Sequence, residues 1–262
     1  MRNIALAISN ETYKRLLIIW DYRFNVLMQL VVISLIFVGA CFFIGGGQLN
    51  PEAIAPLLLG FIVWFYARIV VVAIGADLLG EAQAGTLEQM YMSPIPAELL
   101  LLGRMCAILL TSTIMVFLTT GMLALVLHIQ LSLHWEGIPV LFLTLIGLSG
   151  FTLILAGAAL VFKQVDALAD LIQNAMLFLT GALLPIDHFP SWLATIAHTL
   201  PITQGIIVLR NVELNNQSLM AAWMNGSIPW LALHSAVYLS IGWLVFKWCE
   251  RIAKRRGTLG QY

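Results

Sequence analysis

Long, uninterrupted apolar runs are the main feature of this sequence. A helix needs about 20 mostly apolar residues to cross a hydrocarbon core about 30 Å thick. Six stretches come close to or exceed this length, and charged residues, glycine or proline bound them. They are 24–46, 54–79, 105–127, 138–162, 167–184 and 228–248. The pattern predicts an all-α, polytopic membrane protein with six transmembrane helices, of which 167–184 is the shortest.

The composition supports this prediction. Of the 262 residues, 61% are hydrophobic and only 10% are charged, whereas soluble domains carry about 25% charged residues. The 13 basic and 13 acidic residues cancel, so the chain lacks the bulk positive charge that attracts nucleic acid, and no nucleic-acid partner is expected. The three cysteines show no CxxC or metal-ligand spacing, so neither a disulfide framework nor a thiolate metal site is expected.

The basic residues predict the orientation, because cytoplasmic loops carry the excess of lysine and arginine. With six spans and the N-terminus inside, every basic residue except Arg68 and Arg210 is cytoplasmic. Both termini are therefore predicted to lie in the cytoplasm of a multi-pass protein of the inner or plasma membrane. The chain is expected to consist of an N-terminal segment (1–23), a six-span domain (24–250) and a basic cytoplasmic tail (251–262).

The N-terminal segment has a mixed character. In residues 1–23, charged positions such as Glu11, Lys14 and Arg15 alternate with apolar ones such as Leu17 and Trp20. This alternation is typical of an amphipathic helix in the membrane interface, in contact with lipid. A partly ordered tail is the alternative.

The stretch between the second and third predicted spans has the pattern helix, break, short helix, break. Gly85 can end one helix, and Thr86 with Gln89 fits a capping box that begins the next. Ser93 and Pro94 then end it, so a short cytoplasmic helix is predicted at about 85–93. Leu87, Met90 and Tyr91 share one face of it, and this apolar face is expected to dock on a partner. The alternative is an amphipathic turn resting on its own membrane.

Three charged residues fall in or near the second predicted span. Arg68 lies about midway through it, where an unpaired charge costs a few kcal/mol. It therefore needs a partner on another helix, another subunit or a substrate; packing between helices and a place on the translocation path both remain open. Asp77 and Glu81 are four residues apart on one helical face. They would form part of a gate at the inner boundary or cap the hinge.

Two blocks of sequence resemble a known family. The first contains Glu81, the GTLE motif of residues 85–88, Ser93-Pro94 and Leu102-Gly103-Arg104; the second contains residues 181–185, 189–193, 200–203 and Arg210. In this order they resemble the ABC-type-2 exporter permeases. Leu200 stands where the family usually has Asn before the proline. The resemblance extends over essentially the whole chain.

The resemblance implies the membrane half of an exporter, in which two permease copies, as a homodimer, pair with two cytoplasmic ABC ATPase subunits. It also implies that the short helix contacts the ATPase, which makes Gly85, Thr86, Leu87, Glu88, Met90 and Tyr91 the ATPase-coupling residues. No GxxxxGK[ST] phosphate loop occurs in this chain, so ATP and magnesium are expected on the partner and no cofactor is expected here.

The stretch from about 185 to 210 resembles the family's outer re-entrant helices, which enter the bilayer without crossing it. Phe189, Trp192 and Leu193 are the candidate gate residues there. A helix lying flat on the outer leaflet is the alternative.

The expected function is ATP-driven export of a hydrophobic or amphipathic cargo such as a lipid, glycan-lipid or drug-like molecule. The alternative is an ion-coupled secondary transporter, which the absence of paired acids at mid-membrane disfavours. An enzyme is disfavoured because the sequence shows no nucleophile, metal-ligand or acid–base cluster. Neither a catalytic nor a metal site is predicted.

Overall fold

A computed structural model describes residues 2–48, 51–92, 97–129, 134–162, 165–215 and 217–256. Every regular element in this part of the chain is helical, as predicted. The elements are α1 (Arg2–Asp21), α2 (Arg23–Ile44), α3 (Pro51–Gln83), α4 (Leu87–Met92), α5 (Ala97–Leu127), α6 (Gly137–Phe162), α7 (Asp166–Leu179), the 3₁₀ turn η1 (Ile186–His188), α8 (Ser191–Thr199), α9 (Thr203–Leu214), α10 (Leu219–Met224) and α11 (Ser227–Arg256).

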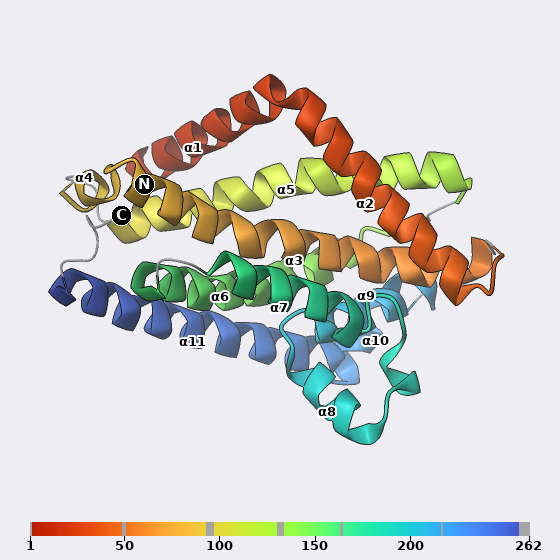
Figure 1. Cartoon of the computed structure of the whole chain (residues 1–262). Helices are drawn as coiled ribbons and strands as arrows, with labels where there is room; N and C mark the ends of the chain where they lie inside the picture. The colour runs from red at the N-terminus through yellow and green to blue at the C-terminus, as the bar shows by residue number, and fades with distance from the viewer. Residues whose placement is uncertain are drawn as a thin grey trace.

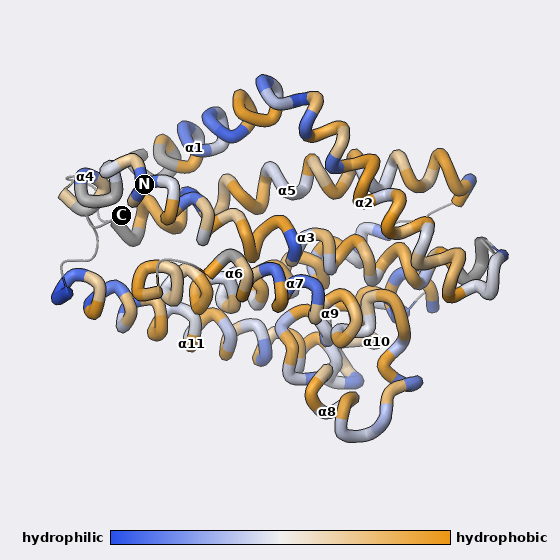
Figure 2. The backbone as a smooth tube through the Cα atoms, viewed as in Figure 1, coloured by the Kyte–Doolittle hydropathy of each residue, from blue (hydrophilic) through white to orange (hydrophobic). Residues whose placement is uncertain are grey.

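The long helices form an elongated bundle (Figure 1). The start of α1, the short helix α4 and the end of α11 lie at one end, which we call the α4 end; α9, α10 and the turn between α2 and α3 lie toward the other. Hydrophobic positions dominate α2, α3, α5 and α6, whereas hydrophilic positions are frequent in α1 and at the last turns of α11 (Figure 2). This distribution fits a bundle whose middle lies in lipid.

Within the described residues, five helices are long and apolar enough to cross a membrane: Arg23–Ile44, Ile54–Gln83, Leu99–Leu127, Gly137–Phe162 and Ser227–Arg256. The predicted span 167–184 is shorter than expected, because α7 ends at Leu179 and its 14 residues extend only about 21 Å. The helices α8 and α9 pass the same test as a pair but are bent by 93°. The number of crossings is therefore five or six, and the topology of six spans stays a prediction.

The ends of two predicted segments differ from expectation. The last helix continues through residues 251–256, which the sequence had assigned to the tail. The third long helix begins eight residues before the predicted 105, at Ala97. Both extensions carry charged residues, which the search for apolar runs left out. A helix can continue beyond the apolar part of a span wherever its backbone remains regular.

The centre of the bundle is α3. Its Phe61 packs between Phe37 of α2 and Trp64 of its own helix, with ring centroids 4.7 and 5.1 Å apart. All three side chains are almost completely buried. The indole Nε1 of Trp64 donates a hydrogen bond of 2.7 Å to the carbonyl oxygen of Gln173, and this bond ties α7 to α3.

Among the described helices, α6 and α11 have the most extensive contact, and small residues make their close approach possible. A Cβ atom on Gly242 would lie 1.9 Å from the carbonyl oxygen of Gly150, and one on Gly150 would lie 2.4 Å from the backbone nitrogen of Leu239. Within lipid, packing of this kind takes the place of the hydrophobic effect between helices. The two backbones can touch only because both positions are glycine.

The bent pair α8–α9 is anchored to α3 by Arg210. Its Nε and Nη2 atoms donate hydrogen bonds of 2.9 Å to the carbonyl oxygens of Pro56 and Ala182. A Cβ on Gly60 would lie 2.6 Å from the Arg210 guanidinium and 2.3 Å from the Ala182 carbonyl oxygen. Arg210, one of the two basic residues not predicted to be cytoplasmic, thus holds α3, α9 and the chain after α7 together.

We expect Gly242→Ala to lower the thermal stability of the purified protein, because the new methyl group must push α11 away from α6. Overpacking of this kind costs about 1–3 kcal/mol. Gly121→Ala is the matched control, since no atom lies within 4 Å of a Cβ at that helical position and alanine has the higher helix propensity. The melting temperatures of both variants are measured in detergent, from the loss of the folded peak in size-exclusion chromatography after heating. Equal melting temperatures for the two variants would show that the close approach is not there.

Candidate coupling and translocation sites

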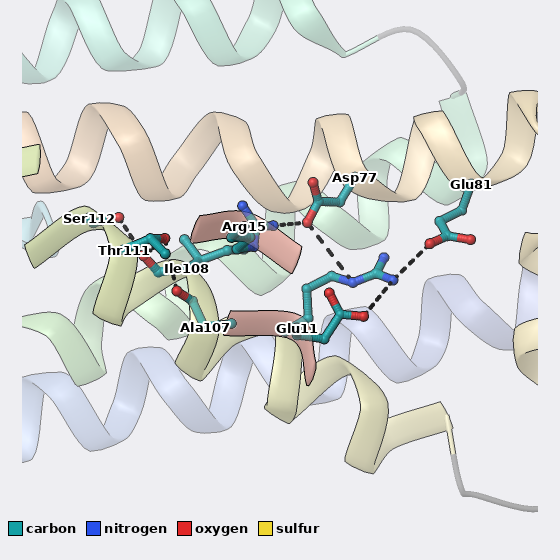
Figure 3. A network of polar contacts seen from close by, with 9 residues as sticks. Glu11, Arg15, Asp77, Glu81, Ala107, Ile108, Thr111 and Ser112 are labelled. Atoms are coloured by element: carbon teal, nitrogen blue, oxygen red, sulfur yellow. Dashed lines mark hydrogen bonds and ion pairs between the residues drawn. The ribbon is translucent and has the colours of Figure 1, made fainter. Parts of the chain in front are cut away.

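A network of charged side chains joins three helices at the α4 end (Figure 3). Glu11 and Arg15 come from α1, Asp77 and Glu81 from α3, and Arg104 from α5. Arg104 Nη2 lies 3.0 Å from Glu81 Oε1 and 3.7 Å from Glu11 Oε1, and its Nε lies 4.0 Å from Asp77 Oδ2. Arg15 pairs with Asp77 as well. The arrangement places two cations among three carboxylates.

Arg104 is the most enclosed member of this network. It is only 6% exposed, and in the described part of the structure its Nη1 atom has no hydrogen-bond partner. A buried cation depends on its carboxylate partners, and removing one side of such a pair leaves an uncompensated charge. Arg104 therefore requires α1 and α3 to remain beside α5.

The network continues into the hinge before α4. The Thr86 hydroxyl donates to the carbonyl oxygen of Glu81 at 3.2 Å and also to its carboxylate. Gly85 has a φ of +70°, a left-handed conformation that glycine adopts without strain. This hydroxyl contact differs from the predicted capping box with Gln89. Through Glu81, it links α4 directly to Arg104.

The short helix predicted at about 85–93 is present as α4, Leu87–Met92. Met90 is partly buried against the core, so it is less available for a partner than its position suggested. Met92, which the sequence did not single out, is 76% exposed. The side chains of Leu87, Glu88 and Tyr91, and all of Ser93 and Pro94, lie outside the described residues. Their part in coupling stays a prediction.

The first helix explains why charged and apolar residues alternate in the N-terminal segment. Glu11 and Arg15, four residues apart, face the network on α3 and α5. Leu6, Tyr13, Leu17 and Trp20 are exposed on the other side, and their spacing of seven, four and three residues places them on one helical face. The helix thus turns a polar face inward and an apolar face outward. This is compatible with contact between the apolar face and lipid.

Arg68 opens onto a cavity of about 510 Å³ between α2, α3, α5 and α7. Its guanidinium lies 5.8 Å from the centre of the Trp64 ring, at cation–π distance. Among the described residues, no carboxylate forms an ion pair with Arg68. Asp170 and Gln173 of α7 also line the cavity. Nothing in the sequence relates Asp170 to Arg68; only the packing of α7 beside α3 brings both to one cavity.

The candidate gate residues lie elsewhere. Phe189 and Leu193 are partly buried and Trp192 is 65% exposed, on or next to α8, which projects from the bundle in Figure 1. None of them lines the Arg68 cavity. Asp77 and Glu81 do not line it either. The candidate residues therefore divide into a charged network, a cavity within the bundle, and a projecting helix.

These features define the class of protein: a multi-pass helical membrane protein with a charged network joining its helices beside a short helix at one end. The ABC-2 type transporter family matches residues 5–214, and the chain belongs to that family. A comparison with curated proteins gives no match. The chain is thus a permease component of an ABC transporter in the cell membrane and is not itself the ATPase. Such permeases work with a cytoplasmic ABC ATPase.

We expect Arg104→Gln to destabilise the protein, because it leaves Glu11, Asp77 and Glu81 without their shared cation. Breaking a fully buried pair costs about 3–5 kcal/mol, and about 2 kcal/mol is expected here because the carboxylates are partly exposed. Arg255→Gln is the control, since it makes the same change at an exposed position of α11. Thermal melting in detergent compares the two. A loss no larger than that of the control would mean that the network contributes nothing to stability.

Proposed function

We propose that this chain is the permease subunit of an ABC exporter, in which two copies form a translocation path driven by two separate ATPase subunits. The α4 end faces the cytoplasm, in keeping with the distribution of basic residues. The cargo is hydrophobic or amphipathic. ATP and magnesium are held by the ATPase, and this chain contributes no catalytic residue.

The observation that carries this proposal is the continuous polar connection from the hinge of α4 into the bundle. Thr86 bonds to Glu81, Glu81 pairs with Arg104, and Arg104 lies within reach of Glu11 and Asp77. Force applied to α4 would therefore reach α3, α5 and α1 together. Coupling between distant sites needs a packed, connected element of this kind.

In the proposed mechanism, ATPase closure displaces α4 and shifts α3 along with it. Glu81 and Arg68 lie 13 positions apart on the same helix, a distance of about 20 Å along its axis. A rigid displacement of α3 would change the shape of the Arg68 cavity between α2, α3, α5 and α7. Alternating access would follow from this change, with Phe189, Trp192 and Leu193 as candidates for the outer gate.

The partner test begins with the protein isolated from its native membrane in mild detergent. We expect an ABC ATPase subunit to copurify at one per permease. Glu88→Arg should lower that association about tenfold or more, because it reverses a charge on α4 at the proposed contact. Asp187→Arg, an identical charge change at an exposed position of η1, should leave association unchanged. A folded protein that copurifies with no ATPase would favour an ion-coupled secondary transporter.

The transmission step has its own test. Thr86→Val keeps the size of the side chain but removes the hydroxyl that bonds to Glu81. We expect the ATPase still to bind, while ATP-driven transport falls about tenfold through loss of one hydrogen bond to a charged group. Thr195→Val, which removes an exposed hydroxyl that bonds within α8, is the control. Transport at the wild-type rate in the Thr86 variant would contradict this role for the hinge contact.

A further inference from the structure

The Arg68 cavity contains charges of both signs. Arg68 of α3 and Asp170 of α7 both line it. The two side chains do not form an ion pair with each other in the described structure. Asp170 instead accepts a hydrogen bond from Nε2 of Gln173. Arg68 is partly buried and Asp170 is exposed. Neither has an ion-pair partner among the described residues, so the cavity presents a cation and an anion to whatever enters it.

Gln173 supplies a third recognition group. The residue is only 4% exposed, and its Oε1 atom has no hydrogen-bond partner within the described part of the chain. The amide is held from two sides, because its Nε2 bonds to Asp170 and its backbone carbonyl accepts from Trp64 Nε1 at 2.7 Å. A buried acceptor without a donor is destabilising, because it has lost its hydrogen bonds to water. A ligand that brings a donor would remove this cost.

Asp170 and Gln173 Oε1 together suit an ammonium group. An ammonium carries one positive charge and three N–H donors in a small volume, so it can pair with the carboxylate and satisfy the amide oxygen simultaneously. The guanidinium of Arg68 suits an anion such as a phosphate, to which arginine can donate two parallel hydrogen bonds. One molecule with both groups would compensate both charges.

Most of the remaining wall of the cavity is apolar, although the amides of Asn25 and Gln29 of α2 also line it. Met28, Val32 and Ile36 of α2 contribute to it, together with Ile69 of α3 and Met115 of α5. The volume of about 510 Å³ lies within the range of ordinary small-molecule sites, about 300–1,000 Å³. Much of α2 is exposed on its other side, where lipid would surround a spanning helix. A hydrocarbon chain could therefore extend from the cavity along α2 into the bilayer.

We propose that this cavity binds a zwitterionic amphiphile, with its anionic group on Arg68, its ammonium on Asp170 and Gln173, and its hydrocarbon chain along the apolar wall. The proposal rests on the proposed function, because it takes the bound molecule to be the cargo. It narrows a generally amphipathic cargo to one whose headgroup carries both charges.

The test uses three probes with the same acyl chain: lysophosphatidylethanolamine, its N-acetyl derivative and the monoacylglycerol. The first is zwitterionic, the second keeps the phosphate but loses the ammonium charge, and the third is neutral. Radiolabelled probes are equilibrated with the purified permease in dodecyl maltoside, whose uncharged headgroup does not compete for charge. We expect the wild-type protein to bind the zwitterionic probe about tenfold more tightly than the N-acetyl derivative, the effect of one ion pair away from bulk water.

Variants assign the two charges. Asp170→Asn should abolish the preference for the zwitterionic probe over the N-acetyl derivative, while Asp170→Glu should retain it. Arg68→Gln should weaken binding of both phosphate probes toward the level of the monoacylglycerol. Asp187→Asn, at an exposed position in η1, is the control and should change nothing. If Asp170→Asn does not fold, the comparison of probes on the wild-type protein still decides the question.

Equal binding of the zwitterionic and N-acetyl probes by the wild-type protein would overturn the proposal, as would an unchanged preference in a folded Asp170→Asn variant. A further arm separates cargo from a resident lipid. If the molecule is cargo, the zwitterionic probe should stimulate ATP hydrolysis by the complex; binding without stimulation would contradict its role as cargo. If the wild-type protein binds its ATPase but shows no preference for the zwitterionic probe, only the headgroup assignment is refuted. If it prefers the zwitterionic probe but binds no ATPase, the proposed exporter function is refuted.

Discussion

The ion pairs of the enclosed Arg104 guanidinium are the interaction on which the packing of helices at the α4 end depends. A buried cation needs carboxylates, and here they come from α1 and α3. This requirement decides how α1 faces the bundle. Its charged positions turn inward toward Arg104 and Asp77, and its large apolar residues are left outside. In water such an arrangement would be unfavourable, but beside a bilayer the exposed apolar face has a suitable environment.

The same helix, α3, carries most of the functional candidates. Arg68 lies at its middle, Asp77 and Glu81 near one end, and the Gly85 hinge directly after it. Its other end is held by Arg210, which bonds to the carbonyl of Pro56. Polar contacts hold α3 at both ends, and its middle packs tightly around Phe61 and Trp64. We therefore expect it to move as one element. This makes it a suitable link between the hinge and the cavity.

The polar groups within the bundle fall into two kinds with different implications. The charges at the α4 end pair with one another across helices, although Nη1 of Arg104 lacks a hydrogen-bond partner among the described residues. In the cavity, neither Arg68 nor Asp170 has an ion-pair partner within the described structure, and Gln173 Oε1 lacks a donor there. Uncompensated polar groups lower stability, and a ligand that completes them removes this cost. The proposed binding in the cavity rests on this difference.

The sequence by itself determined the all-α membrane class, the positions of five long spans, the break at Gly85 and the family, because apolar run length, glycine and proline positions and short motifs are local properties. Only the tertiary structure decided which residues meet. Arg104 with Glu11 and Asp77, Arg210 with the Pro56 carbonyl, and Asp170 in one cavity with Arg68 are all far apart in the chain. In helices that are apolar on nearly every side, periodicity does not reveal which face turns inward. The predicted length of α7 was also wrong. An apolar run shows only that a segment can enter lipid, and it does not show where the helix ends. The bond from Trp64 and the turn at Gly181, which packs against Ile186, depend on tertiary contacts.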